Sequence, residues 1–520
     1  MRKYIYRIGA FLAGLPLLAA TASCEDWFEI MPQSEMVAED FWKDEQDVES
    51  GVGACYRAML EDGFMRRLIV WGELRSDNVV NGTSSDTEIG YILNANLTES
   101  NSYCKWNDFY TVINYCNTVL QNAPAVRERD ADFTEADLNH YIAEVKGIRA
   151  FCYFTLARAF KDIPYIETAY VDDTQRFQVP QTPFENVLDT LIRDLKTVEN
   201  LAVTTYGDDN IEYTRGRITQ KAIWALIADM SLWRGEYQQC VDYCDKILTT
   251  SSNPLSLLPA ETYFNEVFFT GNSDESIWEL QFDNNTQNGA VRTFYGDANN
   301  SCLLSAFSLE TYNGQDWWNG IDMRRIGSYA ENSGTYHIMK GIRATYSTNY
   351  ENIGFGNFTS YNNGLDNWII YRLADVYLMK AEALVEDGDA SGAVDMLSYT
   401  YDRAHPNLDP GTLKEQYGTS PVATVRDLVL DERQREFLFE GKRYFDLVRR
   451  ILREGTATNV INNYILRKYT SGMGLSQSTV MSKINDVNSI FMPIHQDELR
   501  LNHLLNQNPF YEISDDISKN

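Results

Sequence analysis

The sequence predicts a mostly α-helical protein in which tetratricopeptide-like helix pairs form an α-α superhelical scaffold with a loop-rich, short-strand insert. Three observations lead to this fold class. Apolar residues recur at spacings of three and four over most of the 520 residues. A two-helix pattern occurs twice along the chain. One long stretch between the helical parts shows no such spacing and is rich in Gly, Asn, Ser and Tyr.

The helical spacing is clear in several segments. Val48, Val52, Cys55 and Met59 place one apolar stripe on a helix within residues 47–60. The same reasoning predicts helices at 106–120, 135–160, 183–200, 218–234, 237–249, 369–386, 390–404, 422–439 and 441–453.

An internal repeat supports stacked helix pairs. Residues 228–241 (ADMSLWRGEYQQCV) align with residues 381–394 (AEALVEDGDASGAV). Gly235 aligns with Gly388 at the expected turn, and small residues occupy matching positions in the flanking helices. A single helix pair cannot bury its apolar face, so neighbouring pairs are expected to stack.

The remaining segments divide the chain. Residues 72–102 and 253–368 are expected to be loops, the latter with short strands such as Ser276–Leu280. We predict a helical N-terminal region at 24–250 and a second region at 251–520, packed together as one compact unit. Within the second region the insert at 253–368 precedes the helices at 369–453.

The first 23 residues resemble a bacterial lipoprotein signal peptide. Arg2, Lys3 and Arg7 precede a short apolar run, and small residues then lead to Cys24. The run is too short to span a bilayer. Cleavage before Cys24 and its acylation would anchor the chain stably in the cell outer membrane. Glu25 and Asp26 resemble a surface-export signal, and the alternative is an ordinary secretory peptide with an incidental cysteine.

The charge excludes some partners. A formal net charge of -29 opposes nucleic-acid binding and adsorption to anionic lipid. A neutral ligand such as a polysaccharide suits this surface better, and 32 Tyr with 10 Trp offer more aromatic rings than a core requires.

No motif for catalysis, a cofactor or a metal is present in the sequence. Among the other seven cysteines, Cys152, Cys240 and Cys244 lie on the apolar faces of expected helices. These positions favour burial as small hydrophobic side chains over a disulfide or a metal pair, and the disulfide state of the seven stays open. One charged cluster combines Glu432, Arg433, Glu436, Glu440 and Arg443. Spacings of three and four favour ion pairs that fix two helices over acid/base catalysis.

Several segments resemble the SusD/RagB family. The run DLVLDERQREFLFEGKRYFDLVRR at 427–450 is similar to the hallmark of that family, and PIHQDELRLNHLLNQNPFY at 493–511 is similar to its closing motif. Further similarity lies at 144–164, 216–233 and 371–384. His495 and His503 depart from prolines that are common in the family. The resemblance implies a helical surface lipoprotein that binds a glycan, peptide or glycoprotein without catalysis and caps a SusC-like TonB-dependent transporter.

Sugar recognition needs flat aromatic faces beside polar groups that hydrogen-bond hydroxyls. Loops that combine these residue types supply the candidate ligand contacts, which are Asp77, Asn78, Tyr91, Tyr295, Trp317 and Trp318. Phe294 and Asp297 accompany Tyr295, and Asp322 and Arg324 follow Trp317 and Trp318. Tyr336, Tyr361 and Trp368 are weaker candidates. For any single aromatic residue, local packing is the alternative interpretation.

Three functions remain open from the sequence. The first is a non-enzymatic binding protein of a glycan-uptake complex. The second is a surface glycoside hydrolase, because the separation of paired carboxylates is a three-dimensional quantity. The third is an assembly subunit that contacts the transporter and has no ligand of its own.

Overall fold

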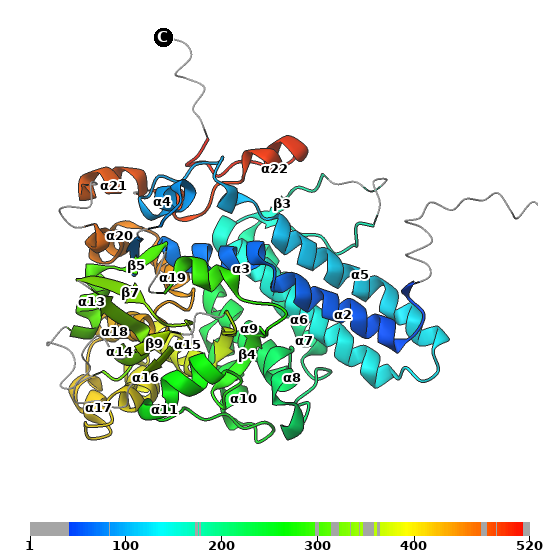
Figure 1. Ribbon diagram of the computed structural model, residues 1–520, viewed down its shortest axis with the longest axis horizontal. Coiled ribbons are helices and arrows are strands. Elements are labelled where there is room, and N and C mark those ends of the chain that lie inside the picture. The colour runs from blue at the N-terminus through cyan, green and yellow to red at the C-terminus, as the bar shows by residue number, and fades with distance from the viewer. Residues whose placement is uncertain are drawn as a thin grey trace, which may run out of the picture.

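The computed structural model of the protein is mostly helical (Figure 1). It describes residues 41–512, apart from positions 83, 172–174, 176–177, 297–300, 314–321, 333, 343, 347–357, 361–363, 470–475 and 485. No helix in this described part is long and apolar enough to cross a membrane. Cys24 and the predicted signal peptide lie outside the described residues.

The N-terminal region forms a layered stack of helices. Its elements are α2 (Glu45–Met59), α3 (Asp62–Ile69), the π-helical turn η2 (Val70–Leu74), α4 (Thr87–Leu93), η3 (Ser102–Cys104), α5 (Asn107–Arg129), α6 (Glu135–Phe160), α7 (Phe184–Val198), η4 (Asp208–Asn210), α8 (Ile211–Gly216), α9 (Gln220–Arg234) and α10 (Tyr237–Thr249). Helix α5 packs against α2 and α6, and α7 packs between α6 and α9. The stripe at Val48, Val52, Cys55 and Met59 is fully buried, as its spacing predicted.

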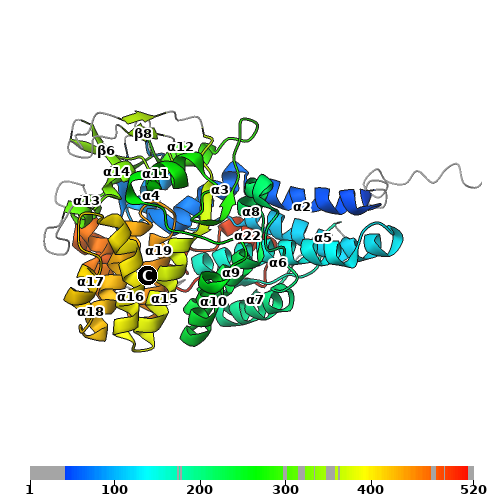
Figure 2. The same ribbon diagram turned by 90° about the horizontal axis from the view of Figure 1, so that it is seen from below.

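The C-terminal region continues the stack. It contains α15 (Leu373–Glu386), α16 (Ala390–Ala404), α17 (Thr412–Tyr417), α18 (Val422–Glu436), α19 (Arg443–Glu454), α20 (Thr458–Asn463), η7 (Ile465–Lys468), α21 (Gln477–Ile484), η8 (Val487–Ile490) and α22 (Gln496–Leu501). Helix α15 packs against α10, so the two helical regions meet there. Figure 2 shows α9, α10, α15 and α16 as neighbours.

The predicted repeat is confirmed. Its two copies are the hairpins α9–α10 and α15–α16, and the matching glycines both take positive φ, +73° at Gly235 and +96° at Gly388. An L-residue with a side chain is strained in that conformation, which explains glycine at both turns. The paired Ala228 and Ala381 are fully buried within the stack.

The insert carries short helices and small sheets. Its elements are α11 (Ala260–Phe264), η5 (Asn265–Thr270), β4 (Ser276–Leu280), α12 (Gly289–Phe294), β5 (Cys302–Leu304), α13 (Ala306–Asn313), α14 (Arg325–Ser328), β6 (Tyr329–Asn332), β7 (Thr335–Ile338), β8 (Ala344–Tyr346), β9 (Phe358–Ser360) and β10 (Trp368–Arg372). Strand β10 pairs with β4, and β8 pairs with β9. A four-stranded sheet has the order β1-β5-β7-β6, where β1 (Val79–Asn81) comes from the N-terminal region. The short strands β2 (Ile163–Pro164) and β3 (Gln181–Thr182) pair separately.

The interpretation of residues 72–102 as loop was incomplete. This stretch contains β1 (Val79–Asn81) and α4, and β1 pairs antiparallel with β5 in the register Val79↔Leu304. The partner strand lies in the insert, so local sequence gave no sign of the pairing. The segment therefore joins the N-terminal region to the insert.

Buried ion pairs hold the insert against the C-terminal helices. We call this set the ionic junction: Glu275, Arg324, Arg372, Arg403, Glu432, Glu436 and Glu440. Arg372 is fully buried, and its guanidinium lies 2.6 Å from Glu275 and 2.9 Å from Glu440. Burial alone would raise the pKa of Glu436, but Arg403, Arg372 and Arg324 hold that pKa well below its usual value.

The ion-pair interpretation of the charged cluster is confirmed, but its expected partners are corrected. Glu436 and Glu440 pair with arginines of β10, α16 and the insert rather than with neighbours on the same helices. Arg433 pairs with Asp446, and Arg443 pairs with Asp77. Spacing along a helix shows which charges share a face, whereas their partners depend on tertiary packing.

Cys152, Cys240 and Cys244 are buried, as predicted for small hydrophobic side chains, and the other four cysteines after Cys24 are buried as well.

Candidate functional site

Asp77 and Asn78, two of the candidate ligand contacts, are fully buried. Both carboxylate oxygens of Asp77 accept hydrogen bonds of 2.8 Å from Arg443. The Asn78 amide donates to Glu73 at 2.6 Å and accepts from Gln434 at 2.8 Å. Neither side chain is open to a ligand in this structure, so the sequence-based assignment is corrected to a structural role.

The aromatic candidates fall in different places. Tyr295 is fully buried beside Phe439, with ring centroids 5.9 Å apart, so its assignment as a ligand contact is also corrected. Tyr91 lies on α4 and is 45% exposed, open to solvent. Trp317 and Trp318 lie outside the described residues.

Most of the residues near the main candidates, and most of the weaker candidates, are not open to solvent. Phe294 and Trp368 are buried, Asp322 and Arg324 form a buried ion pair at 2.7 Å, and Tyr336 is half-buried. Asp297 and Tyr361 lie outside the described residues.

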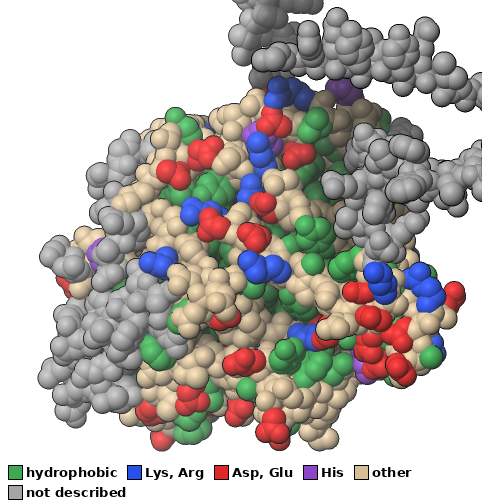
Figure 3. All heavy atoms as spheres, turned by 45° about the vertical axis from the view of Figure 1, so that its right-hand side comes forward, with side chains coloured by type: hydrophobic (Ala, Val, Ile, Leu, Met, Phe, Trp, Pro, Cys, Tyr) green, Lys and Arg blue, Asp and Glu red, His purple; other side chains and the backbone are tan. Residues whose placement is uncertain are grey.

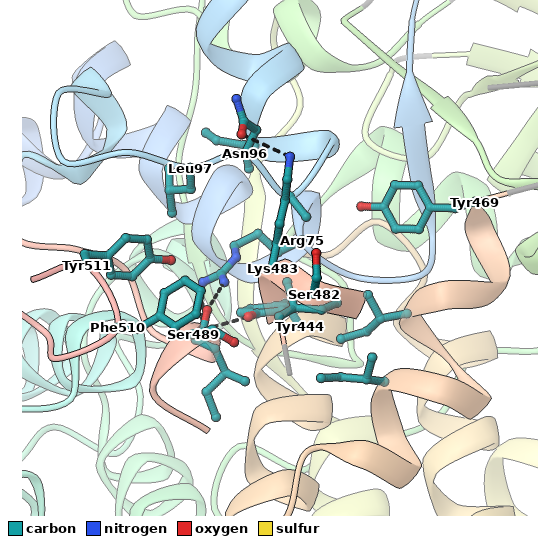
Figure 4. A pocket seen from close by; sticks show the side chains of 16 residues that line it. Arg75, Asn96, Leu97, Tyr444, Tyr469, Ser482, Lys483, Ser489, Phe510 and Tyr511 are labelled. Atoms are coloured by element: carbon teal, nitrogen blue, oxygen red, sulfur yellow. Dashed lines mark hydrogen bonds between the residues drawn. The ribbon is translucent and has the colours of Figure 1, made fainter. Parts of the chain in front are cut away.

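A cavity of about 270 Å³ lies among α4, α19, α21 and the C-terminal tail (Figure 4). We call it the tail pocket. Its side chains with rings or charges are Arg75, Tyr444, Tyr469, Lys483, Phe510 and Tyr511. Figure 4 shows Phe510 and Tyr511 on one side and Tyr469 on the other, with Arg75 and Lys483 between them. Apart from the adjacent Phe510 and Tyr511, these residues come from different segments, and the first and last are more than four hundred positions apart in sequence.

A close backbone contact positions the floor of the pocket. A Cβ on Gly72 would lie only 1.8 Å from the carbonyl oxygen of Gly441, so glycine is needed where η2 meets the turn before α19. Arg75 follows η2, and its guanidinium lies 4.8 Å from the ring centroid of Tyr444. Its Nη1 also donates to the carbonyl of Ile490 at 2.7 Å. The close approach of Gly72 to Gly441 therefore places Arg75 beside Tyr444.

The aromatic walls are held by hydrogen bonds to the backbone. The hydroxyl of Tyr444 donates to the carbonyl of Ile490 at 2.7 Å, and that of Tyr469 donates to the carbonyl of Leu93 at 2.7 Å. Burial raises the pKa of Tyr469 and of Tyr511, so both phenols stay neutral. Rings fixed in this way lose little conformational freedom when a ligand binds.

The tail pocket is cationic although the protein as a whole is acidic. Arg75 and Lys483 line it, and none of its described lining residues is Asp or Glu. The Lys483 ammonium donates to the amide oxygen of Asn96 at 3.1 Å, while Arg75 bonds to backbone carbonyls. In the described part of the chain, neither cation is paired with a carboxylate, so both charges act on whatever enters the cavity.

The pocket has the parts of a binding site. Ring faces suit the C–H faces of a sugar, and the ammonium, amide and hydroxyl groups suit its oxygens. Among the described residues, no group of three or more His, Cys, Asp or Glu side chains is placed to hold a metal ion.

Sequence reasoning did not identify the lining residues of the pocket, although it marked their neighbourhoods. Arg75 and Asn96 lie in the polar 72–102 segment. Tyr444 lies in the run 427–450, and Phe510 and Tyr511 end the run 493–511. A signal was therefore present in the motifs, but nothing in the sequence placed the motifs side by side.

The chain thus combines a helical-hairpin scaffold with an aromatic-lined pocket. Comparisons with known proteins then give the family: residues 290–511 match the SusD family, and residues 26–232 match the family described as starch-binding and associating with the outer membrane. The chain belongs to the SusD family, as its motifs predicted.

Individual relatives are distant in sequence. A SusD-like protein of Formosa agariphila is 25% identical, with 83% of this chain and 89% of the relative aligned. The fold is similar to that of a SusD homolog from Bacteroides thetaiotaomicron, with a TM-score of 0.73 at 17% identity over 91% of this chain and 98% of the other. A laminarin-binding SusD-like protein gives a TM-score of 0.65 at 22% identity, over 90% and 99% of the two chains.

Proposed function

We propose that this protein binds an oligo- or polysaccharide outside the cell and delivers it, uncleaved, to a SusC-like TonB-dependent transporter. The observation that supports this most directly is the tail pocket, where rings from separate segments surround a cavity suited to a sugar residue. The starch-binding description of the matching family supports the same ligand class. Glycan binding by the laminarin-binding relative is consistent with it.

Titration calorimetry of the mature chain carrying Cys24→Ser, with a panel of oligosaccharides, tests this function. We expect at least one glycan to bind, and Phe510→Ala to weaken that binding about tenfold without unfolding the protein. Tyr399→Ala is the matched control, because Tyr399 is an exposed ring on α16 that does not line the pocket.

Other outcomes would support the alternatives. Released reducing sugar would favour a surface glycoside hydrolase. Binding of peptides or glycoproteins in place of glycans would change the ligand class. No ligand at all, with a large outer-membrane channel co-purifying, would favour an assembly subunit.

Trp317, Trp318 and Tyr91 stay proposed ligand contacts. The double substitution of Trp317 and Trp318 by Ala is expected to weaken glycan binding while the unfolding midpoint stays constant. Unchanged binding in that variant would remove both residues from the site.

Acylated Cys24 is proposed to anchor the protein on the cell surface. Labelling with a radioactive fatty acid should mark the wild-type chain and not Cys24→Ser, and protease added to whole cells should digest the wild-type chain. A chain that is unlabelled and protected from protease would contradict the anchor.

A further inference from the structure

A second concave surface lies among α2, α6 and α8, and none of its lining residues lines the tail pocket. Two hollows of about 420 and 430 Å³ share Glu49, Tyr213 and Arg217 and so form one continuous groove. Both ribbon views place α8 beside α2 and α6 (Figures 1 and 2). We call it the tyrosine groove, since Tyr56, Tyr141, Tyr206 and Tyr213 line it.

The floor of the groove is rigid and electrically balanced. Arg217 donates to both oxygens of Glu144, at 2.6 and 2.8 Å, and Glu144 also accepts from the Tyr56 hydroxyl at 2.6 Å. The same hydroxyl accepts from the backbone N–H of Ile218 at 2.8 Å. Because Arg217 and Glu144 neutralise each other, the floor presents apolar ring surface and satisfied hydrogen bonds.

Two aromatic rings stand at the sides. The rings of Tyr206 and Tyr213 have centroids 6.1 Å apart, and the Arg217 guanidinium lies 5.2 Å from the first and 5.9 Å from the second. Tyr213 is 53% exposed, which leaves much of its ring open to a ligand. Asn210, Gln281 and His140 supply hydrogen-bonding groups around them.

A glycine in the middle of α2 lines the groove. Gly53 lines the first hollow, and a Cβ built on it would meet no atom within 4 Å. Two residues earlier, a Cβ on Gly51 would lie 2.8 Å from Trp42, so packing explains that glycine. A mid-helix glycine destabilises a helix relative to alanine, and packing does not account for Gly53. Because a Cβ there would lie in open space, only a side chain larger than that of alanine would fill the hollow.

The charges around the groove select the ligand. Glu49, Asp137 and Glu212 line it in addition to the paired Glu144. Burial and then the negative charge of Asp137 raise the pKa of the neighbouring Glu45, with smaller contributions from Asp130 and Glu49. Figure 3 shows acidic side chains gathered on the right-hand side of the molecule, where the outer ends of α2, α5 and α6 lie. Acidic sugars are repelled by this potential, whereas neutral and amine-bearing sugars are not.

We infer that the tyrosine groove is a second carbohydrate-binding site, for neutral or amine-bearing sugar residues. The inference rests on the proposed function for the ligand class, and on the groove itself for the place. Two separate sites on one chain raise the effective concentration of a long glycan at the surface.

The test uses the mature Cys24→Ser chain with Phe510→Ala, which weakens the tail pocket about tenfold, so that any binding lost on a further change at Gly53 is assigned to the groove. The probes are laminarihexaose, maltohexaose, a chitosan hexamer and a hexamer of uronic acid, measured by titration calorimetry. We expect at least one of the first three probes to bind, and Gly53→Trp to weaken that binding at least tenfold by filling the hollow. Gly53→Ala is the matched control and is expected to bind as before.

The outcomes separate the two sites. Binding that Gly53→Trp leaves unchanged, or preferential binding of the uronic acid hexamer, would overturn the groove inference. Binding in the chain with an intact tail pocket but none in the Phe510→Ala chain would overturn it as well, and would leave the proposed function intact. Failure of every probe to bind either chain would overturn both.

Discussion

The ionic junction and the tail pocket use arginine in opposite ways. Arg372 in the junction is fully buried and contacts the carboxylates of Glu275, Glu436 and Glu440. Arg75 in the pocket is half-buried and is held by backbone carbonyls and the ring of Tyr444. Fully paired charges in the junction leave nothing for a ligand, whereas the pocket keeps cations that no described carboxylate neutralises. Pairing, rather than the presence of charge, separates a structural site from a binding site here.

The tyrosine groove combines features of the ionic junction and the tail pocket. Arg217 is paired with Glu144, as in the junction, and also lies 3.6 Å from Glu49, but tyrosine rings and the acids Asp137 and Glu212 surround this group. The same protein therefore offers one cationic and one acidic surface to ligands.

Arg372→Met gives the largest expected effect. Removing the arginine takes away one of the counter-charges of three buried carboxylates, and breaking a buried pair in this way typically costs about 3–5 kcal/mol of unfolding free energy. Urea unfolding should show a lower midpoint. Arg57→Met is the control, because the Arg57–Glu61 pair is 3.8 Å long with both side chains 66% exposed, and its midpoint should not move. Equal midpoints in the two variants would show that the junction does not stabilise the fold.

Glu73→Gln tests a buried acid that forms no ion pair with any described residue. Burial raises the pKa of Glu73 to about 8, and its Oε1 accepts from Asn78. The folded state therefore retains a proton that the unfolded state releases near pH 4.5, so this group's stabilisation is lost as pH rises from about 4.5 to 8. Glutamine imitates the protonated acid.

The difference in unfolding free energy between Glu73→Gln and wild type should shift in favour of the variant by on the order of 2–4 kcal/mol from pH 5 to pH 8.5, at about 1.4 kcal/mol per pKa unit. Urea unfolding at both pH values measures this change. A difference that does not depend on pH would mean that Glu73 is ionised in the folded protein, as the junction carboxylates are.

Buried charges also mark where sequence reasoning reached its limit. The helices and the α9–α10 and α15–α16 repeat were predictable, since apolar spacing and a turn glycine are local signals. Asp77 was misassigned because it lies in a polar, Asn-rich stretch that is typical of an exposed loop, while its partner Arg443 is 366 positions away. Tyr295 was misassigned because aromatic residues in a loop-rich insert fit either packing or binding equally well.

The tail pocket was unpredictable for the same reason. Its lining residues come from segments far apart in sequence, which lie together in a fold where β1 pairs with β5 and the C-terminal tail packs near α4. The family motifs pointed to the right segments, but a motif does not show whether its aromatic residues face a cavity or the core.

Lys483→Met gives the smallest expected effect and completes the comparison. The ammonium of Lys483 bonds only to the Asn96 amide among the described residues, so its loss should change the unfolding free energy by less than about 0.5 kcal/mol. Glycan binding should weaken about three- to tenfold, because a ligand loses one charge-assisted hydrogen bond. Calorimetry on the mature chain measures this, with Lys414→Met as the control, since Lys414 pairs with Asp395 away from the pocket. If Lys483→Met instead lowered stability as much as Arg372→Met, both charges would be structural and the contrast between junction and pocket would fail.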